Sequence, residues 1–100
     1  MLYSEKQIVG RIKGHIAKRG GGYPAWVVGV SKEPRSHLFR KHGVRKVGDR
    51  WILMHAKSCA VAREAQLYLV EKLRLSDAAT KGDPLADFVY AYRKSANTKP

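Results

Sequence analysis

Seven basic side chains are concentrated in residues 32–50, and they are the groups in this chain best suited to chemistry with an anion. Lysine and arginine neutralise phosphate charge, and such contacts give affinity that depends strongly on salt and little on base sequence. The segment therefore predicts a nucleic-acid-binding surface built on phosphate contacts, with DNA as the expected partner. The seven residues are Lys32, Arg35, Arg40, Lys41, Arg45, Lys46 and Arg50.

Two histidines, His37 and His42, lie in the same segment, five positions apart. On a helix this spacing turns the two side chains about 140 degrees away from each other, which is a poor arrangement for one metal ion. The other two histidines, His15 and His55, belong to different segments. We therefore expect no metal site built from histidines alone.

The single cysteine, Cys59, excludes an intramolecular disulfide and a multi-cysteine zinc site, and it favours a reducing compartment. We interpret it as a small packed residue, because the sequence places no base beside it. No apolar run approaches the ~18 residues of a membrane span, and the N-terminal MLYSEKQ lacks a signal-peptide pattern. We therefore expect a cytoplasmic protein that is not a membrane protein.

The formal net charge of +12 on 100 residues favours a polyanionic partner, nucleic acid first and an anionic membrane surface second. Solubility alone is the alternative, although a charge of roughly 2 to 8 already suffices for a small domain. Residues 1–50 carry 12 basic and 3 acidic side chains, whereas residues 51–100 carry 8 and 5. The first half of the chain is thus expected to build most of the polyanion-binding surface.

The elements that position the basic segment begin with a short apolar run. Trp26-Val27-Val28-Gly29-Val30 is rich in β-branched and aromatic residues and predicts a buried strand. Glu33-Pro34 predicts the start of a helix, because proline is well tolerated at the first helical position. Gly43 is expected to end that helix in a left-handed conformation. The basic residues are therefore expected on a helix and on the loop that follows it.

Residues 4–19 predict an amphipathic helix, because isoleucine recurs at every fourth position and a serine–glutamine capping box opens it. Gly10 and Gly14 weaken this helix by roughly 1 kcal/mol each, and their spacing suggests close packing. The glycine run at 20–22 predicts a flexible joint between the helix and the strand.

The second half predicts a strand at Trp51 to Ala56, a helix capped by Ser58 that runs to about Leu75, and a polar connection over 76–84. Alternation over residues 88–92 predicts a last strand, followed by a loose tail. One face of that strand carries an aromatic row that either stacks bases or fills a sheet–helix interface. The row is Phe88, Tyr90 and Tyr92.

The expected order is helix, strand, helix, strand, helix, strand, which predicts an α+β fold with a small three-stranded sheet flanked by helices. We expect one domain over residues 1–100. It comprises an N-terminal helix and glycine joint over 1–22, a core over 23–94 and a tail over 95–100. Strand order cannot be predicted from this pattern.

Four segments of the chain resemble the GIY-YIG nuclease superfamily. Trp26 to Ser31 resembles the family's YIG strand, and Pro34 to His42 resembles its proline-entered helix ending in arginine and histidine. The helix over 58–75 resembles the one that bears the family's metal-binding glutamate, and Gly82 to Lys94 resembles the closing strand of small stand-alone members. The resemblance implies a GIY-YIG-like fold over the core.

Family members, as the resemblance implies, cut DNA with a tyrosine near the attacking water, an arginine and a histidine at the phosphate, and a glutamate that holds a divalent metal. This chain has Val27 in place of the tyrosine, His37 in place of the arginine and Gln66 in place of the glutamate. These changes remove a hydroxyl, a bidentate cation and a carboxylate. His42 is retained, and Tyr23 is the candidate for the other family tyrosine.

The first hypothesis is therefore a non-catalytic nucleic-acid-binding domain without a cofactor. The second is an active magnesium-dependent endonuclease with a shifted site at Tyr23, Arg35, His42 and Glu64. The third is a protein-interaction module for an acidic partner. The candidate site positions carried over from the resemblance are Tyr23, Val27, Arg35, His37, His42 and Gln66.

Overall fold

The computed structural model describes residues 2–20, 22–47, 50–78, 85–96 and 98. Within them the chain forms a mixed four-stranded sheet with helices on both faces, an α+β arrangement. The elements are α1 Glu5–Arg19, the 3₁₀ turn η1 Tyr23–Ala25, β1 Trp26–Ser31, α2 Pro34–Ser36, the π-helical segment η2 His37–Lys41, β2 Trp51–His55, α3 Cys59–Glu71, β3 Ser76–Asp77 and β4 Phe88–Arg93.

The prediction of a three-stranded sheet was wrong, because the sheet has four strands in the order β2-β4-β1-β3. Strand β4 lies antiparallel between β1 and β2, and β3 pairs in parallel with β1. The missed strand consists of Ser76 and Asp77 alone, and two polar residues show no alternation that a sequence pattern could detect. The order of the strands in the sheet results from pairing between segments that are distant in the sequence.

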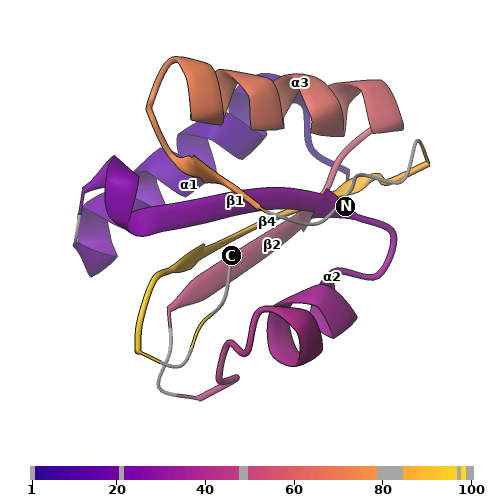
Figure 1. Ribbon diagram of the computed structural model, residues 1–100. Helices are drawn as coiled ribbons and strands as arrows, with labels where there is room; N and C mark the ends of the chain where they lie inside the picture. The colour runs from indigo at the N-terminus through magenta and orange to yellow at the C-terminus, as the bar shows by residue number, and fades with distance from the viewer. Residues whose placement is uncertain (1, 21, 48–49, 79–84, 97, 99–100) are drawn as a thin grey trace.

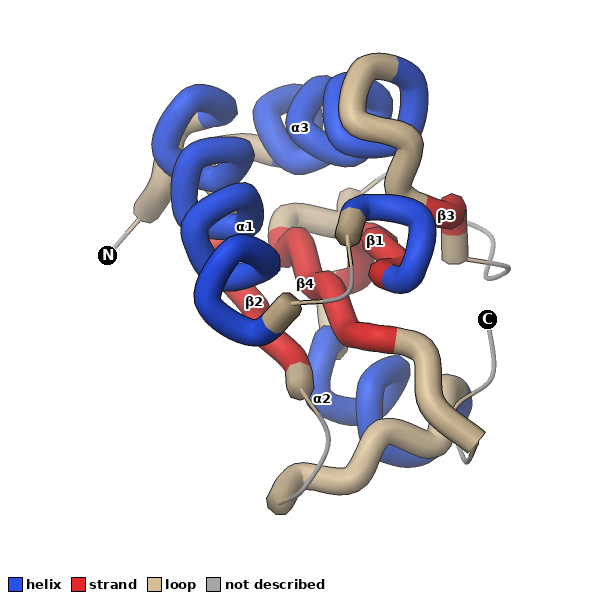
Figure 2. The backbone as a smooth tube through the Cα atoms, turned by 90° about the vertical axis from the view of Figure 1, so that its left-hand side faces the viewer, coloured by secondary structure: helices blue, strands red, loops and turns tan. Residues whose placement is uncertain are grey.

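Helices α1 and α3 cover one face of the sheet, and α2 with η2 covers the other (Figures 1 and 2). The larger apolar cluster lies between the sheet and α1 with α3, where the isoleucine stripe of α1 is buried. The smaller cluster lies beneath η2 and contains Leu38, Val27, Tyr90 and Tyr92. Because side chains alternate between the two faces of β1 and β4, these strands contribute residues to two cores of unequal size.

The helix starts and the helix end predicted from capping residues are confirmed. Ser4 caps α1, and its capping box with Gln7 is formed in both directions. Ser58 caps α3 by accepting from the Val61 amide at 3.1 Å. Gly43 has a φ of 69°, the left-handed conformation expected after η2.

The bounds of several elements differ from the predictions by a few residues. Helix α3 ends at Glu71 rather than near Leu75, and β2 ends at His55, while Ala56 forms an isolated bridge with Tyr3. Strand β4 continues to Arg93. Parts of the predicted glycine joint, of the 76–84 connection with Gly82 and Asp83, and of the tail lie outside the described residues.

Candidate nucleic-acid interface

The segment that carries the basic residues is anchored to the sheet by a buried polar network. His42 is fully buried, and its Nε2 lies 2.7 Å from the Tyr90 hydroxyl while its Nδ1 lies 3.0 Å from the Tyr92 hydroxyl. A neutral imidazole in this position donates to one tyrosine hydroxyl and accepts from the other. The three side chains join the end of η2 to the central strand β4.

Burial defines the chemical state of this network. Burial, with the neighbouring Tyr90 as a lesser cause, raises the pKa of Tyr92 far above its usual value. Tyr92 therefore keeps its proton and acts as a hydrogen-bonding group. Because Tyr90 and Tyr92 are both fully buried, neither ring presents a face on which a base could stack.

Gly29 makes room for this network on the neighbouring strand. It pairs with Tyr90 across β1 and β4, and a Cβ at this position would lie 2.5 Å from the Tyr90 hydroxyl oxygen and 2.9 Å from the Ala78 Cβ. Only glycine leaves space for the phenol ring to lie across β1 and reach His42. The glycine in the predicted strand is thus explained by a close approach of a side chain.

His37 lies at the other end of η2 in a partly buried position. Its Nδ1 is shielded from solvent and has no hydrogen-bond partner among the residues that the structure describes, and its ring lies 6.3 Å from that of Tyr90. Burial first, then Lys41 and His42, lower the pKa of His37, and Glu33 opposes them. At neutral pH His37 is therefore an uncharged side chain rather than a phosphate-binding cation.

The seven basic residues predicted to bind phosphate, here called the basic rim, are all exposed. Six of the seven, all but Arg45, have no salt-bridge partner within the described parts of the chain. Lys32 precedes α2, Arg35 lies on α2, Arg40 and Lys41 lie on η2, and the other three lie in the loop that leads to β2. The charge of these six side chains is thus available to an external partner, which is the arrangement that phosphate binding requires.

Aromatic contacts hold the loop of the basic rim against the helix. The Trp51 indole donates to the Lys46 carbonyl at 3.1 Å, and the Trp51 ring packs edge-on against Phe39 at 5.1 Å. The Val44 amide donates to the Leu38 carbonyl at 2.9 Å, which closes the end of η2. These contacts position the loop without using the charged ends of its lysines and arginines.

The strand order adds further cations to the basic rim. The pairing of β2 with β4 sets the end of β4 beside the start of β2, and the Arg93 amide donates to the Arg50 carbonyl at 3.0 Å. Lys94 follows directly and is exposed. Arg93 and Lys94 were not predicted to belong to this surface, because nothing in the sequence shows which strands are neighbours.

The structure brings together three of the six carried-over site positions. Val27, His37 and His42 all lie on the sheet face covered by α2 and η2, where Val27 is buried. Arg35, the fourth, is exposed on α2 itself. The exposed Arg35 and the buried His42 and Val27 therefore lie on the same side of the sheet.

The remaining two positions lie on the opposite face of the sheet. Tyr23 packs against the larger apolar cluster. Gln66 is on α3, where its amide donates to the Asp77 carboxylate at 2.7 Å, which gives this glutamine the polar partner that its place beside the core requires. Glu64, proposed for the shifted site, is exposed on α3. The structure therefore does not bring Tyr23, Gln66 or Glu64 to His42.

Within the ranges that the structure describes, no three side chains of the types His, Cys, Asp and Glu are grouped so that they could hold a metal ion. His55 pairs with Asp87 at 2.7 Å and stacks on Phe88. None of the helices in the described ranges combines the length and the apolar character needed to cross a bilayer.

Comparisons of this chain with protein-family models, with curated proteins and with solved structures found no match.

Proposed function

We propose that this protein binds nucleic acid, DNA in the first instance, through phosphate contacts made by the basic rim, and that it does so without cleaving the strand. The observation that carries the proposal is the exposure of all seven predicted cations, six of them with no acidic partner in the described residues. Arg93 and Lys94 extend this surface past the start of β2. A surface of this kind binds phosphates with little preference for sequence.

The placement of the aromatic residues favours contacts with the phosphate backbone of the nucleic acid over stacking on its bases. Tyr90 and Tyr92 are fully buried, and Phe39 and Trp51 are partly buried and packed against each other. Single-strand-binding proteins rely on exposed aromatic platforms, which these rings do not supply. We therefore expect a duplex to bind at least as tightly as a single strand of the same length.

The absence of cleavage in the proposal rests on the positions of the candidate catalytic residues. His42 is buried and engaged with two tyrosines, while Gln66 and Glu64 lie on the helix that covers the other face. The resemblance to the GIY-YIG superfamily stays a prediction, and phosphate binding does not depend on it. Nicking of a supercoiled plasmid in magnesium or manganese that disappears in His42→Ala would refute this part of the proposal.

The binding itself is tested with two triple variants that change the net charge equally. The first replaces Arg40, Lys46 and Arg50 of the basic rim by glutamine. The control replaces Lys6, Lys13 and Lys57, which are also exposed but lie outside the rim. Because each lost phosphate contact weakens binding, the rim variant should bind a fluorescent duplex far more weakly than the control.

Two results of that experiment would count against the proposal. Equal weakening in both variants would show that net charge alone attracts the duplex and that the rim is not the binding surface. No measurable binding of wild-type protein to duplex or single strand at low salt would remove nucleic acid as the partner. Recovery of a defined acidic protein in a pull-down that survives nuclease treatment would then support the protein-interaction alternative.

A further inference from the structure

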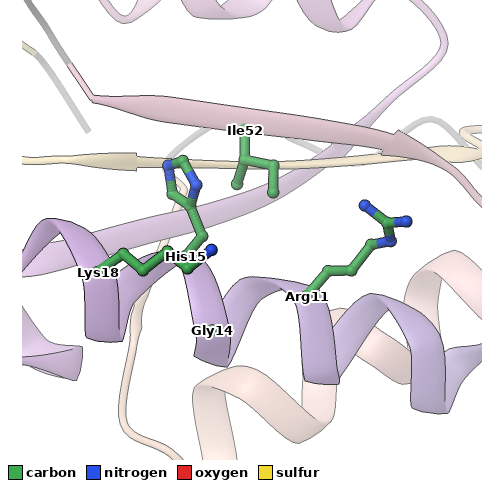
Figure 3. A pocket seen from close by; sticks show the side chains of 5 residues that line it. All are labelled: Arg11, Gly14, His15, Lys18 and Ile52. Carbon is green, nitrogen blue, oxygen red and sulfur yellow. The ribbon is translucent and has the colours of Figure 1, made fainter.

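A pocket of about 300 Å³ lies between α1 and the edge strand β2, away from α2 and η2. Its lining residues are Arg11, Gly14, His15, Lys18 and Ile52. Figure 3 shows Arg11 and His15 rising from α1 toward β2, with the Arg11 guanidinium directed away from His15 and the Lys18 side chain laid along the helix toward His15. The pocket therefore has a polar, cationic side on the helix and an apolar wall at Ile52.

The lining residues carry positive charge and no negative charge. Arg11 and Lys18 carry positive charge, and none of the described residues that line the pocket is acidic. The Arg11 guanidinium carbon lies 4.8 Å from the centre of the Tyr3 ring, a cation–π contact that holds the arginine at its place. Two fixed cations beside a neutral or protonated imidazole favour a dianion over a monoanion.

The imidazole of His15 makes no hydrogen bond within the part of the chain that the structure describes, and its Nε2 is shielded from solvent. The ring packs edge-on against Trp26 at 5.5 Å, which fixes its position above the helix. An orienting aromatic contact combined with an unsatisfied polar ring is unusual in a side chain that only fills space. A ligand oxygen in the pocket would give the ring the partner that it lacks.

Gly14 leaves the helix bare at the floor of the pocket. A Cβ at Gly14 or at Gly10 would meet no atom within 4 Å outside the helix itself, so the close packing predicted from this glycine pair was wrong. Both glycines weaken the helix, and neither is required by a packed neighbour. At Gly14 the missing side chain instead keeps the pocket open.

We propose that this pocket binds a phosphate group, with Arg11, His15 and Lys18 as its ligands and Ile52 as an apolar wall for the group that carries the phosphate. A phosphate monoester has a charge between about −1.5 and −2 at neutral pH, which matches two fixed cations better than a carboxylate does. The volume lies near the lower end of the range for ligand sites, so the bound group is small. The phosphate belongs either to a small sugar phosphate or to a strand of nucleic acid.

The test uses inorganic phosphate as the probe, with acetate as the monoanion control, in ¹H–¹⁵N NMR titrations of the full chain. Phosphate should produce saturable shifts at the amides of Gly14, His15 and Ile52, whereas acetate at the same ionic strength should not. Gly14→Leu should fill the pocket and weaken phosphate binding by about tenfold or more. Gly10→Leu is the matched control, because it has equally open surroundings but does not line the pocket.

The folded state of both variants is checked by their melting temperatures, which should not fall, because leucine favours helix over glycine. Wild-type shifts that do not saturate, or equal phosphate binding by Gly14→Leu and Gly10→Leu, would overturn the proposal. Parallel titrations with ribose 5-phosphate and with a duplex oligonucleotide then identify the source. Weaker duplex binding in Gly14→Leu than in Gly10→Leu assigns the pocket to a nucleic-acid phosphate, and a loss confined to ribose 5-phosphate assigns it to a small ester.

Discussion

Replacing His42 by leucine should destabilise the protein strongly, because leucine fills a similar volume but cannot bond to Tyr90 or Tyr92. The imidazole now bonds to the two buried hydroxyls at 2.7 Å and 3.0 Å. Removing one hydrogen bond from a buried polar group costs about 1–3 kcal/mol, so the loss of both bonds to the imidazole amounts to about 2–6 kcal/mol. A loss of about 4 kcal/mol would lower the Tm by roughly 15–30 °C in a domain of this size.

Chemical denaturation of His42→Leu and of the triple variant His42→Leu/Tyr90→Phe/Tyr92→Phe measures this effect directly. The triple variant removes the hydroxyls together with their partner, and such a replacement of a whole polar network is often close to neutral. It should therefore recover most of the stability that His42→Leu loses. DNA affinity of the triple variant should equal that of wild type, because none of the three side chains reaches the surface.

Two results would refute this interpretation of His42. A triple variant as unstable as His42→Leu would show that packing of the imidazole, and not its hydrogen bonds, maintains the fold. A triple variant with wild-type stability and lost DNA binding would show that this group of side chains contacts the nucleic acid, against the burial seen here.

Two further predictions concern Gly29 and the partly buried histidines. Gly29→Ala should lower the free energy of unfolding in urea by about 1–3 kcal/mol, because the new Cβ would meet the Tyr90 phenol and Ala78. Gly14→Ala should be neutral or stabilising, because a Cβ there meets nothing and alanine favours helix. Equal effects of the two substitutions would contradict this prediction. The pKa values of His15 and His37 are lowered, mainly by burial, so the unfolded chain takes up protons first and stability should fall as the pH drops from 7 through 6.5 toward the folded pKa values. Denaturation of the His15→Gln/His37→Gln double variant at pH 7 and pH 5.5 checks this prediction. The double variant should lose less unfolding free energy between the two pH values than wild type, and an equal loss would assign the effect to other groups.

Local sequence signals predicted the helices and three of the four strands, because each depends on residues close together in the chain. The capping box at Ser4 and the left-handed Gly43 are satisfied within a few residues of where they occur. The exposure of the basic rim was predicted in the same way, because a segment dense in lysine and arginine is seldom buried. In these cases the physics that fixes the local structure operates over one or two helical turns.

The features that escaped prediction depend on contacts between distant segments. The bonds from His42 to Tyr90 and Tyr92 span 48 and 50 residues, and only the folded sheet brings them together. The two-residue strand β3 exists because its backbone meets β1, and not because of its own composition. Arg93 joins the surface of the basic rim through the pairing of β4 with β2. Strand order therefore determined the parts of the candidate site that the sequence could not show.

The salt dependence of duplex binding tests the central claim most directly. Fluorescence anisotropy with a labelled duplex between about 50 and 200 mM NaCl should give a slope of log affinity against log salt of about −4 to −6, as expected for five to seven phosphate contacts. The rim variant at Arg40, Lys46 and Arg50 should flatten that slope by about 3, and the control at Lys6, Lys13 and Lys57 should leave it nearly unchanged. Affinity independent of salt, or equal slopes in the two variants, would contradict phosphate binding by the basic rim.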